Sequence, residues 1–359
     1  MELTEKNKYM SSVFFVVLLL SHTLFISSVC AKDYGVRYIS YTSNKSGNFD
    51  IYLMDTISEN HRSLTNHPAH DRDPTWSPDG RFLAYTSNRD GTFKIYVMNV
   101  RTGEHRRLTQ RHAKEWAPAW SPDGKWIAFD SDAPEDILLM EWGKVNIASH
   151  IYKADINGEN LVQLTDQGKN LKPAWSPDSQ WIAFVSYHRG NDRKGIYVMD
   201  ADGRRLRRLD DKAVQALNAI LQSECAWSPD GKQIAFSMRV PRTEQVHLCT
   251  MDVNGKNFRL LTQDGPIAGH KNVKESPFPR VQHPAWSPNG KWIAYVLEQT
   301  FGNADIYVID ASGNGHRKPL VKDAARYQSP AWVPGTYFSV SPSTRKQTTL
   351  WGRLKQGKK

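Results

Sequence analysis

The sequence is poor in cysteine. Only three cysteines occur among its 359 residues, and Cys30 lies in an N-terminal leader discussed below. The remaining pair, Cys225 and Cys249, is too few to hold a small disulfide-rich fold together. The fold must therefore depend on a hydrophobic core. The 39% of hydrophobic residues supplies one, while the mean hydropathy of −0.59 indicates many polar loops.

Motifs of common catalytic and metal sites are also missing from the sequence. It contains no G-x-S-x-G nucleophile elbow, no H-E-x-x-H zinc motif and no EF-hand loop. Residues of ligand type do occur, but they come from distant positions without local ligand spacing. We therefore expect a protein without catalytic residues, without a bound metal and without a cofactor.

Acidic residues are missing from the C-terminal end of the chain. Residues 335–359 contain six lysines and arginines and no acid. The formal net charge of the chain is +10, so this tail carries most of it and about +4 remains elsewhere. A basic excess confined to one short tail does not indicate a nucleic-acid-binding protein. We treat 335–359 as a separate basic tail, which forms either short strands or an arm directed toward an acidic envelope surface.

The one long apolar run is VFFVVLLLSHTLFI at 13–26, preceded by Lys6 and Lys8 and followed by small residues. This pattern predicts a secretory signal peptide, residues 1–31, with cleavage after Ala31. An uncleaved anchor and a lipoprotein are the alternatives. The run is short for a spanning helix, and Ser-Ser-Val is a poor lipoprotein box. We expect an exported protein, periplasmic or extracellular, with no membrane-spanning segment in the mature chain.

A tryptophan recurs six times, at intervals of 44 to 59 residues. The six are Trp76, Trp120, Trp175, Trp227, Trp286 and Trp332. The first five are followed by SPDG, SPDG, SPDS, SPDG and SPNG. Serine, proline and a final glycine at these positions are typical of a type I turn, so each string predicts a β-hairpin. The second strand of each hairpin, such as WIAF at 126–129, is continuously apolar, which indicates burial on both faces.

Two further strands follow each hairpin. The third strand is similar to IYVMD, and it lies at 51–55, 95–99, 151–155, 196–200, 246–252 and 306–310. The fourth strand ends in Leu-Thr at 63–65, 107–109, 163–165 and 260–262, and in degraded forms at 207–210 and 318–321. Four strands per unit at this period are typical of the blades of a β-propeller.

The two ends of the repeat region complement each other. Residues 37–41 match a second strand without its tryptophan hairpin, and residues 329–334 match a first strand without the rest of its blade. We therefore predict an all-β fold at 32–334. It is a six-bladed β-propeller of four-stranded blades, closed where the C-terminal strand completes the N-terminal blade. Such a ring leaves no long strand edge exposed, so we expect a monomer.

The repeat carries a resemblance to a known family. P-A-W-S-P-D-G-K-x-I-A-F, then D-I-Y-x-M-D and R-x-L-T, resembles the repeat of TolB β-propellers and is similar to propellers of prolyl-oligopeptidase-type peptidases. The resemblance covers about residues 35 to 334. TolB proteins are periplasmic components of the Tol–Pal envelope system, so it implies a propeller in the cell envelope with a protein or peptide partner. We expect no room for the additional N-terminal domain of TolB proteins, and no hydrolase domain.

Positions that the units do not share are the candidates for function. The hairpin turns are uniform and fall at one end of the ring, whereas the loops entering the tryptophan strands vary at the other end. These varied segments should surround the mouth of the central channel. The candidate binding residues are His70, Asp71, Arg72, Asp73, Glu115, Trp116, Lys172, Glu224, Gln282, His283, Tyr327 and Gln328. Their mixed chemistry suits a peptide, a sugar or a protein loop; an ordinary water-filled channel is the alternative.

Three functions are compatible with this pattern. The favoured one is an exported binding or scaffold protein that recognises a protein, peptide or glycan through the varied loops and the channel mouth. The second is a propeller enzyme, a lyase or hydrolase acting on a polysaccharide or peptide. In that case His70, His283, Glu115 and Glu224 would meet for acid–base or metal chemistry. The third is a structural envelope protein tethered through its tail.

Three insertions interrupt the repeat. Residues 132–149 contain an apolar cluster that is either an exposed patch or folded over the ring. Residues 211–222 have helical spacing and predict a short helix packed on the ring, and 263–283 form a candidate lid or binding loop. Cys225 and Cys249 fall in the first and third strands of one blade. We expect about 9–10 Å between their Cα atoms, beyond the reach of a disulfide, and hence two free buried thiols.

Overall fold

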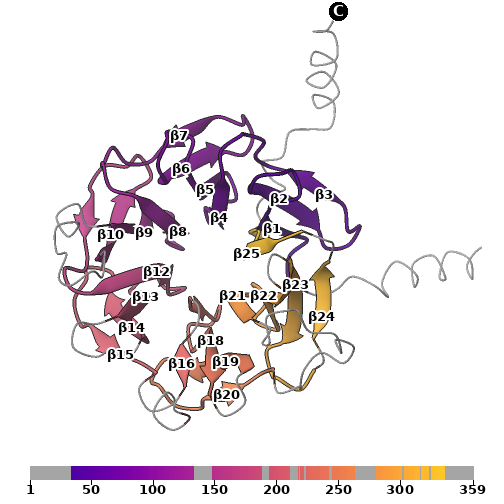
Figure 1. The fold of residues 1–359 in the computed structure, drawn as a ribbon. Coiled ribbons are helices and arrows are strands. Elements are labelled where there is room, and N and C mark those ends of the chain that lie inside the picture. Colours follow the sequence, from indigo (N-terminus) through magenta and orange to yellow (C-terminus); the bar gives the residue numbers. More distant parts are fainter. Residues whose placement is uncertain are drawn as a thin grey trace, which may run out of the picture.

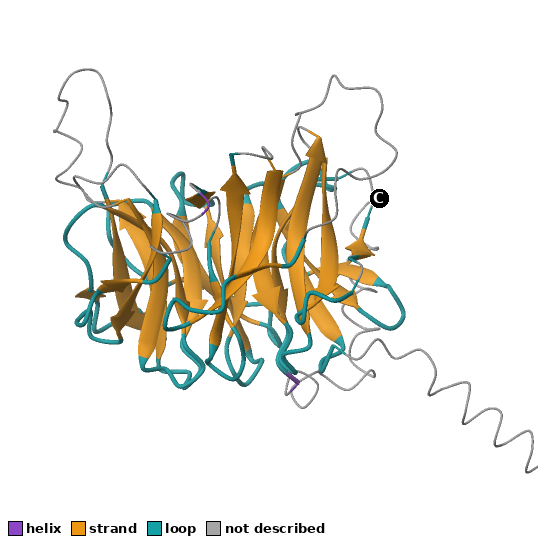
Figure 2. Ribbon diagram, turned by 90° about the horizontal axis from the view of Figure 1, so that it is seen from below, coloured by secondary structure: helices purple, strands orange, loops and turns teal. Residues whose placement is uncertain are grey.

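A computed structural model describes most of the predicted propeller region. The described residues are 34–132, 148–187, 194–210, 217, 219–221, 224–241, 245–262, 280–300, 303–315, 317–322 and 325–335. The predicted leader and all but the first residue of the tail lie outside these ranges. The sheets stand side by side around a common axis (Figure 1), and their strands run between the two faces of the ring (Figure 2). None of the described helical residues forms a segment long and apolar enough to cross a membrane.

The first strand of each repeat unit ends at the repeated tryptophan. These strands are β4 (Asp71–Trp76), β8 (Glu115–Trp120), β12 (Lys169–Trp175), β16 (Ile220–Leu221) with β17 (Ala226–Trp227), β21 (Arg280–Trp286) and β25 (Tyr327–Trp332). Of these, β4, β8, β12, β21 and β25 lie nearest the axis (Figure 1). First strands of neighbouring units contact one another, as β4 contacts both β25 and β8. Side chains near their starts can therefore meet across unit boundaries.

Three strands extend each unit outward. The second strands are β1 (Tyr38–Ser43), β5 (Phe82–Ser87), β9 (Trp126–Asp132), β13 (Trp181–Tyr187), β18 (Gln233–Val240) and β22 (Trp292–Thr300). The third strands are β2 (Asp50–Asp55), β6 (Lys94–Asn99), β10 (Ser149–Asp155), β14 (Gly195–Asp200), β19 (Gln245–Asp252) and β23 (Asn303–Asp310). The fourth strands are β3 (His61–Ser63), β7 (His105–Arg107), β11 (Val162–Gln163), β15 (Arg207–Arg208), β20 (Arg259–Leu260) and β24 (Lys318–Val321).

The C-terminal strand pairs with the N-terminal part of the fold. Strand β25 lies antiparallel to β1 in the order β25-β1-β2-β3, with Ile39 opposite Trp332 and Ser43 opposite Tyr327. Figure 1 shows β25 (yellow) beside β1 (indigo). The all-β prediction is confirmed. A bridge between Ser149 and Lys169 merges β8 to β15 into one eight-stranded sheet, so the sheets alone do not fix the number of blades, which stays a prediction.

The repeated tryptophan joins neighbouring units. In three units the indole Nε1 donates, at 3.1 Å, to the carbonyl of the alanine before the preceding unit's tryptophan, as Trp175 does to Ala119. At the junction of the chain ends, Trp76 Nε1 donates to Ser40 Oγ at 2.9 Å, and Ser40 Oγ donates to the Ala331 carbonyl at 3.2 Å. In four units, therefore, the repeated tryptophan bonds to the unit before it.

The Ser-Pro-Asp-Gly turn is held by its own side chains. Ser77 Oγ donates to Asp79 Oδ1 at 2.6 Å and accepts the N–H of Phe82 at 2.9 Å. Gly80 has φ of 67° and donates its N–H to the Ser77 carbonyl at 2.9 Å. The same serine contacts recur at Ser121, Ser176, Ser228 and Ser287. These bonds explain why serine, an acid or amide, and a left-handed residue return together.

The Leu-Thr pair ties the fourth strand to the third. Leu164 N–H donates to the Ile151 carbonyl at 2.8 Å, and Ile151 N–H donates back to Thr165 Oγ1 at 2.9 Å. In the RRLD form, Asp210 Oδ1 accepts the N–H of Ile196 at 3.1 Å in place of the threonine hydroxyl. That segment is therefore a chemical equivalent of Leu-Thr.

The core lies between adjacent sheets. Each apolar cluster of the described residues combines side chains of two neighbouring units; one contains Ile51 and Leu53 of β2 with Leu83 and Tyr85 of β5. Ala84, which lies between Leu83 and Tyr85 in the sequence, belongs to the next cluster. Leu83, Ala84 and Tyr85 are all fully buried. Burial on both faces explains why the second strands are continuously apolar.

The two mature cysteines are free and buried, as predicted. Burial, together with the nearby Glu224 carboxylate, raises the pKa of Cys225 to about 12, so the thiol stays protonated at neutral pH.

The predictions for the three insertions agree with the structure to different extents. The helix predicted at 211–222 is wrong at its end, because Ile220–Leu221 forms β16 and pairs with β18. Leu217 does have helical geometry and packs against the same apolar cluster as Leu221. The apolar cluster at 137–142 lies outside the described residues, as does 263–279 of the predicted lid; the end of that lid, 280–283, belongs to β21.

Candidate binding site at the ring axis

One position of the repeat supplies polar groups that face one another. It lies three residues before each tryptophan and is defined here as the inner ring: Asp73, Ala117, Lys172, Glu224, His283 and Ser329. In every unit except that of Glu224, this residue has a left-handed backbone, with φ between 47° and 58°. Non-glycine residues rarely adopt such values, so five occurrences at one repeat position mark a built feature of the ring.

A β-bulge causes this backbone geometry. The pairing of β4 with β5 shifts between Arg72 and Thr75, and the same shift occurs in β8, β12 and β21. A bulge re-aims side chains at the point where strand pairing is interrupted. Two of the freed N–H groups bond to the preceding unit: Lys172 N–H donates to Asp130 Oδ1 at 2.9 Å, and Ala117 N–H donates to Thr86 Oγ1 at 3.1 Å. The innermost strands thus turn their inner-ring side chains toward other units.

Five of the six inner-ring side chains, all but that of Ala117, form a continuous polar network. Lys172 Nζ lies 3.4 Å from Asp73 Oδ1, which also accepts the Ser329 hydroxyl at 2.7 Å. Ser329 Oγ is 3.5 Å from His283 Nδ1, and His283 Nδ1 contacts Glu224 Oε1. Because Lys172 and Asp73 belong to units that are not neighbours, the network crosses the axis of the ring.

The network holds its acids in the charged form. Burial alone raises the pKa of Asp73, but Lys172 and the Ser329 hydroxyl lower it below its ordinary value. Burial also opposes ionisation of Glu224, yet His283 and Lys172 lower its pKa well below the usual range. Burial lowers the pKa of Lys172, while Asp73, Glu224 and Asp130 raise it overall. Asp73, Glu224 and Lys172 are therefore charged at neutral pH.

Asp130 lies behind the network, in β9, and is 2% exposed. Burial raises its pKa to about 7, although the backbone N–H and ammonium group of Lys172 lower it. The other units have Thr42, Thr86, Val185, Ser237 and Val296 at this position. Asp130 is thus the one acid at this repeat position, and it titrates near neutrality next to the charged network.

The residue before each inner-ring residue defines an outer ring, one position closer to the varied end. Its described members are Arg72, Trp116, Leu171, Gln282 and Gln328. All five are half-buried. Arg72 Cζ lies 3.9 Å from the centre of the Phe49 ring, and the rings of Trp116 and Phe93 lie 3.9 Å apart. These side chains lie between the inner ring and the varied end of the strands.

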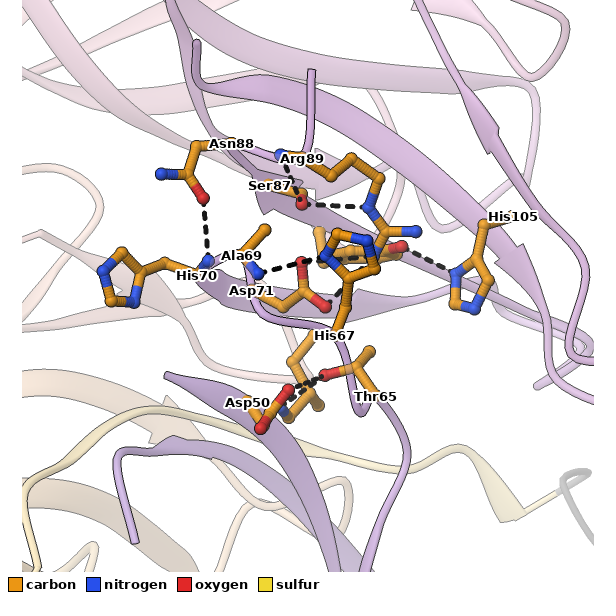
Figure 3. Close-up of polar contacts among 12 residues, drawn as sticks. Asp50, Thr65, His67, Ala69, His70, Asp71, Ser87, Asn88, Arg89 and His105 are labelled. Carbon is orange, nitrogen blue, oxygen red and sulfur yellow. Dashed lines mark hydrogen bonds and ion pairs between the residues drawn. The ribbon is translucent and has the colours of Figure 1, made fainter. Parts of the chain in front are cut away.

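Three predicted mouth residues do not reach the surface. Each of them comes directly before an outer-ring residue in the sequence. The three are Asp71, Glu115 and Tyr327, and all are 0% exposed. Asp71 Oδ2 pairs with Arg89 Nη2 at 3.0 Å (Figure 3), and Glu115 accepts the Thr109 hydroxyl. Side chains alternate along a strand, so these three face the packed side between sheets. Their burial removes them from the predicted ligand-contacting set.

His70 fixes the loop between β3 and β4. Its backbone N–H donates to Asn88 Oδ1 at 2.7 Å (Figure 3), and its Nδ1 accepts the N–H of Phe49 at 3.2 Å. The ring also contacts the Phe49 ring, with centroids 5.7 Å apart. His70 therefore positions the aromatic ring on which Arg72 lies.

The sequence predicted most members of both rings but not Ser329 in the network or Asp130 behind it. Ser329 and Asp130 were not predicted, although each could have been found by aligning the repeats. Ser329 holds the inner-ring position of its unit, and Asp130 is an acid where other units have small or apolar residues. Among the described residues, no group of three His, Cys, Asp or Glu side chains could hold a metal ion.

Comparison with known proteins places this repeat in a family. A model of the TolB beta propeller domain, PD40, matches residues 34–141 and 137–267, which is more than half of the chain. The chain belongs to this family. The matched ranges include several of the tryptophan units described above, and the predicted family resemblance is confirmed.

Individual PD40-related proteins give the extent of the likeness. The Tol-Pal system protein TolB of Francisella tularensis subsp. mediasiatica is 29% identical over 229 residues, covering 52% of this chain and 49% of that protein. The structure of TolB from Acinetobacter baumannii matches with a TM-score of 0.63 at 22% identity, covering 83% of this chain and 66% of the other. An oligogalacturonate lyase from Vibrio parahaemolyticus matches with a TM-score of 0.55 at 16% identity, covering 80% and 74%.

These structural matches show a shared fold, and they confirm the propeller prediction. The chain spans about half or less of the length of the curated relatives that it matches first. Because a propeller carries many unrelated functions, the site must decide between them.

Proposed function

We propose that this chain is an exported docking module that binds a protein segment at the outer ring. One observation carries the proposal. Inner-ring and outer-ring residues are consecutive in the same strands but differ in their side-chain bonds. The inner-ring groups bond to one another, whereas Arg72, Gln282 and Gln328 make no side-chain hydrogen bond within the described residues. The inner ring is complete in itself, and the outer ring offers its polar groups to a ligand.

The inner ring also sets how a partner approaches. Its network of Lys172, Asp73, Ser329, His283 and Glu224 spans the axis directly beneath the outer ring. A ligand then docks against one face of the ring. A protein loop or an extended peptide can contact such a mixed polar and aromatic surface. A glycan is the alternative ligand of the same surface.

Export is part of the proposal. The apolar leader at 13–26 supports it, as does the likeness to relatives named as Tol-Pal system proteins. We therefore place the partner in the cell envelope and expect the chain to act as a monomer there.

Site-specific photo-crosslinking in cells tests the docking function. A benzophenone amino acid replaces Gln328 in the outer ring, or Lys125 in an exposed hairpin turn at the opposite end. We expect a discrete protein adduct at position 328 and none at 125, identified by mass spectrometry. Equal capture at both positions, or capture at 125 alone, contradicts docking at the outer ring.

A catalytic function has one specific observation in its favour. His283 and Glu224 do meet, as an acid–base reaction requires, and the fold is shared with an oligogalacturonate lyase. The other two residues of that hypothesis do not join them, because Glu115 is buried beside Thr109 and His70 holds the Phe49 loop. Turnover of an oligogalacturonate by the wild type, abolished in His283→Ala, would establish the enzyme and displace the docking proposal.

A further inference from the structure

Arg72 is a half-buried cation without a hydrogen-bonding partner among the described residues. It follows Asp71 in β4 and lies with its guanidinium carbon 3.9 Å from the Phe49 ring centre. Its Nε is buried and unpaired, and no described acceptor bonds to the guanidinium. A guanidinium has five N–H donors in a planar fork, and leaving the buried Nε donor unpaired is costly. The Arg72 guanidinium can therefore donate hydrogen bonds to an acceptor supplied by a ligand.

The acids around Arg72 are already engaged elsewhere. Asp73 is bonded to Lys172 and Ser329, and Asp71 is paired with Arg89. Burial lowers the pKa of Arg72; Asp73 raises it, and the nearby guanidinium of Arg326 lowers it further. Arg326 belongs to the loop entering β25, at the same end of the ring, and its Nη2 lies 3.8 Å from Glu298 Oε1. Arg72 is therefore the guanidinium in this part of the mouth that is left to attract an anion.

The rest of the outer ring divides into a polar side and an apolar side. Next to Arg72, in order around the axis, come the amides of Gln328 and Gln282. On its other side come Trp116, which packs against Phe93, and the aliphatic Leu171. Amides and a guanidinium can bind a carboxylate, and an indole with a leucine can cover an apolar side chain. A ligand that combines both groups matches the two sides.

We propose that Arg72 binds the carboxylate of an aspartate or glutamate in a partner protein segment, with an apolar residue of that segment against Trp116 and Leu171. The inference rests on the docking function proposed above and names the chemistry of the partner. A planar guanidinium matches a carboxylate with two parallel hydrogen bonds, which gives geometric selectivity as well as attraction. An acidic peptide is favoured over a uronic acid chain because Leu171 and Trp116 offer an aliphatic and aromatic surface to a side chain.

Selection from a random peptide library tests the proposal without a known partner. A displayed library of 12-residue peptides is selected on the immobilised mature chain, on Arg72→Gln and on Arg101→Gln. Arg101 is an exposed arginine in the turn after β6, at the opposite end of the ring. We expect wild type and Arg101→Gln to enrich peptides with an acidic residue beside an apolar one. Arg72→Gln should lose the acidic preference.

A titration with one selected peptide then isolates the contact. Replacing its acidic residue by the corresponding amide should weaken binding to wild type about tenfold or more, the usual loss for a charge-assisted bond. The same replacement should leave binding to Arg72→Gln unchanged, while Arg72→Lys should keep part of the preference. Because the peptide change is measured on the wild-type chain, the test survives even if Arg72→Gln fails to fold.

The outcomes separate the proposal from the docking function. Enrichment of peptides without acidic preference, or equal binding of acid and amide peptides, overturns the role of Arg72 and leaves docking in place. Binding of trigalacturonate or inorganic phosphate that depends on Arg72, without any peptide enrichment, replaces the acidic peptide by a different anion and overturns the proposed partner class. No binding of any probe by the wild type overturns both.

Discussion

Single glycines hold the turns of one unit against the backbone of the unit before it. Gly158, Gly203 and Gly255 lie in the turns between third and fourth strands, with φ of 83°, 81° and 78°. A Cβ at Gly203 would approach the Leu164 carbonyl oxygen to 2.7 Å, and one at Gly158 would overlap the Leu108 carbonyl oxygen. These leucines are the ones that precede threonine in the fourth strands. Glycine is therefore required by both conformation and contact.

Gly158→Ala should be far more destabilising than Gly91→Ala. Both glycines have similar φ, 83° and 86°, so both substitutions incur about 1 kcal/mol of left-handed strain. A Cβ at Gly91 meets nothing within 4 Å, whereas at Gly158 the Leu108 backbone must move. We expect an additional loss of about 1–3 kcal/mol in Gly158→Ala, measured by urea unfolding. Equal losses would show that the turn does not press on the preceding unit.

Asp130 makes stability depend on pH. Its pKa is about 7 in the folded chain against 3.8 for the ordinary group, so between these values the unfolded chain releases a proton that the folded chain keeps. The free energy of unfolding should therefore fall by about 1.4 kcal/mol per pH unit in that window and level off above pH 7. Below pH 3.8 both states are protonated and the effect vanishes.

Asp130→Asn should remove this part of the pH dependence. An asparagine oxygen can still accept the Lys172 N–H, which Asp130 Oδ1 accepts at 2.9 Å. Urea unfolding at pH 5 and pH 7 should show a loss about 2–3 kcal/mol smaller than in wild type. Asp166→Asn, at an exposed position, serves as the control. If Asp130→Asn and wild type lose the same stability, the carboxyl is not buried in the folded chain.

At the scale of elements, the tryptophan strands bind unit to unit. Trp175 and Trp120 are equally buried, at 7% exposure. Trp175 Nε1 donates to the Ala119 carbonyl at 3.1 Å, whereas Trp120 Nε1 has no partner within the described residues. The two positions therefore share packing and differ in one bond between units.

Trp175→Phe should lose more stability than Trp120→Phe. Both remove a similar amount of buried ring, but only Trp175→Phe leaves the Ala119 carbonyl without its indole donor. We expect a difference of about 1–2 kcal/mol in the free energy of unfolding. A larger loss in Trp120→Phe would mean that ring volume, and not the bond between units, sets the tryptophan period.

The strands could be predicted well because each has a local signal. Turn residues mark the hairpins, continuous apolar runs mark the second strands, and Leu-Thr marks the fourth. The bulge that builds the inner ring has no such signal. Asp73, Lys172, His283 and Ser329 precede proline, and a pre-proline residue is expected to be extended; their left-handed backbone is set by the ring. That difference decided which predicted mouth residues face the axis and which, like Glu115, are buried.

At the scale of the whole molecule, positions that the repeat units share have a different role from positions that they do not share. Positions that repeat, such as the tryptophan and the Leu-Thr pair, join strands and units. Positions that do not repeat meet at the axis, where the inner ring is self-paired and the outer ring is open to a partner. The leader and most of the tail, which motivated the export and tethering hypotheses, lie outside the described residues.

Capture of envelope partners by two matched variants tests this division most directly. One variant changes the outer-ring residues Arg72, Gln282 and Gln328 to alanine. The other changes Arg81, Gln180 and Gln233, which follow the uniform hairpin turns, so each variant loses one arginine and two glutamines. Crosslinking in cells and mass spectrometry should show a protein captured by wild type and the turn variant and lost from the outer-ring variant. Loss from the turn variant alone, or from neither, would contradict the account.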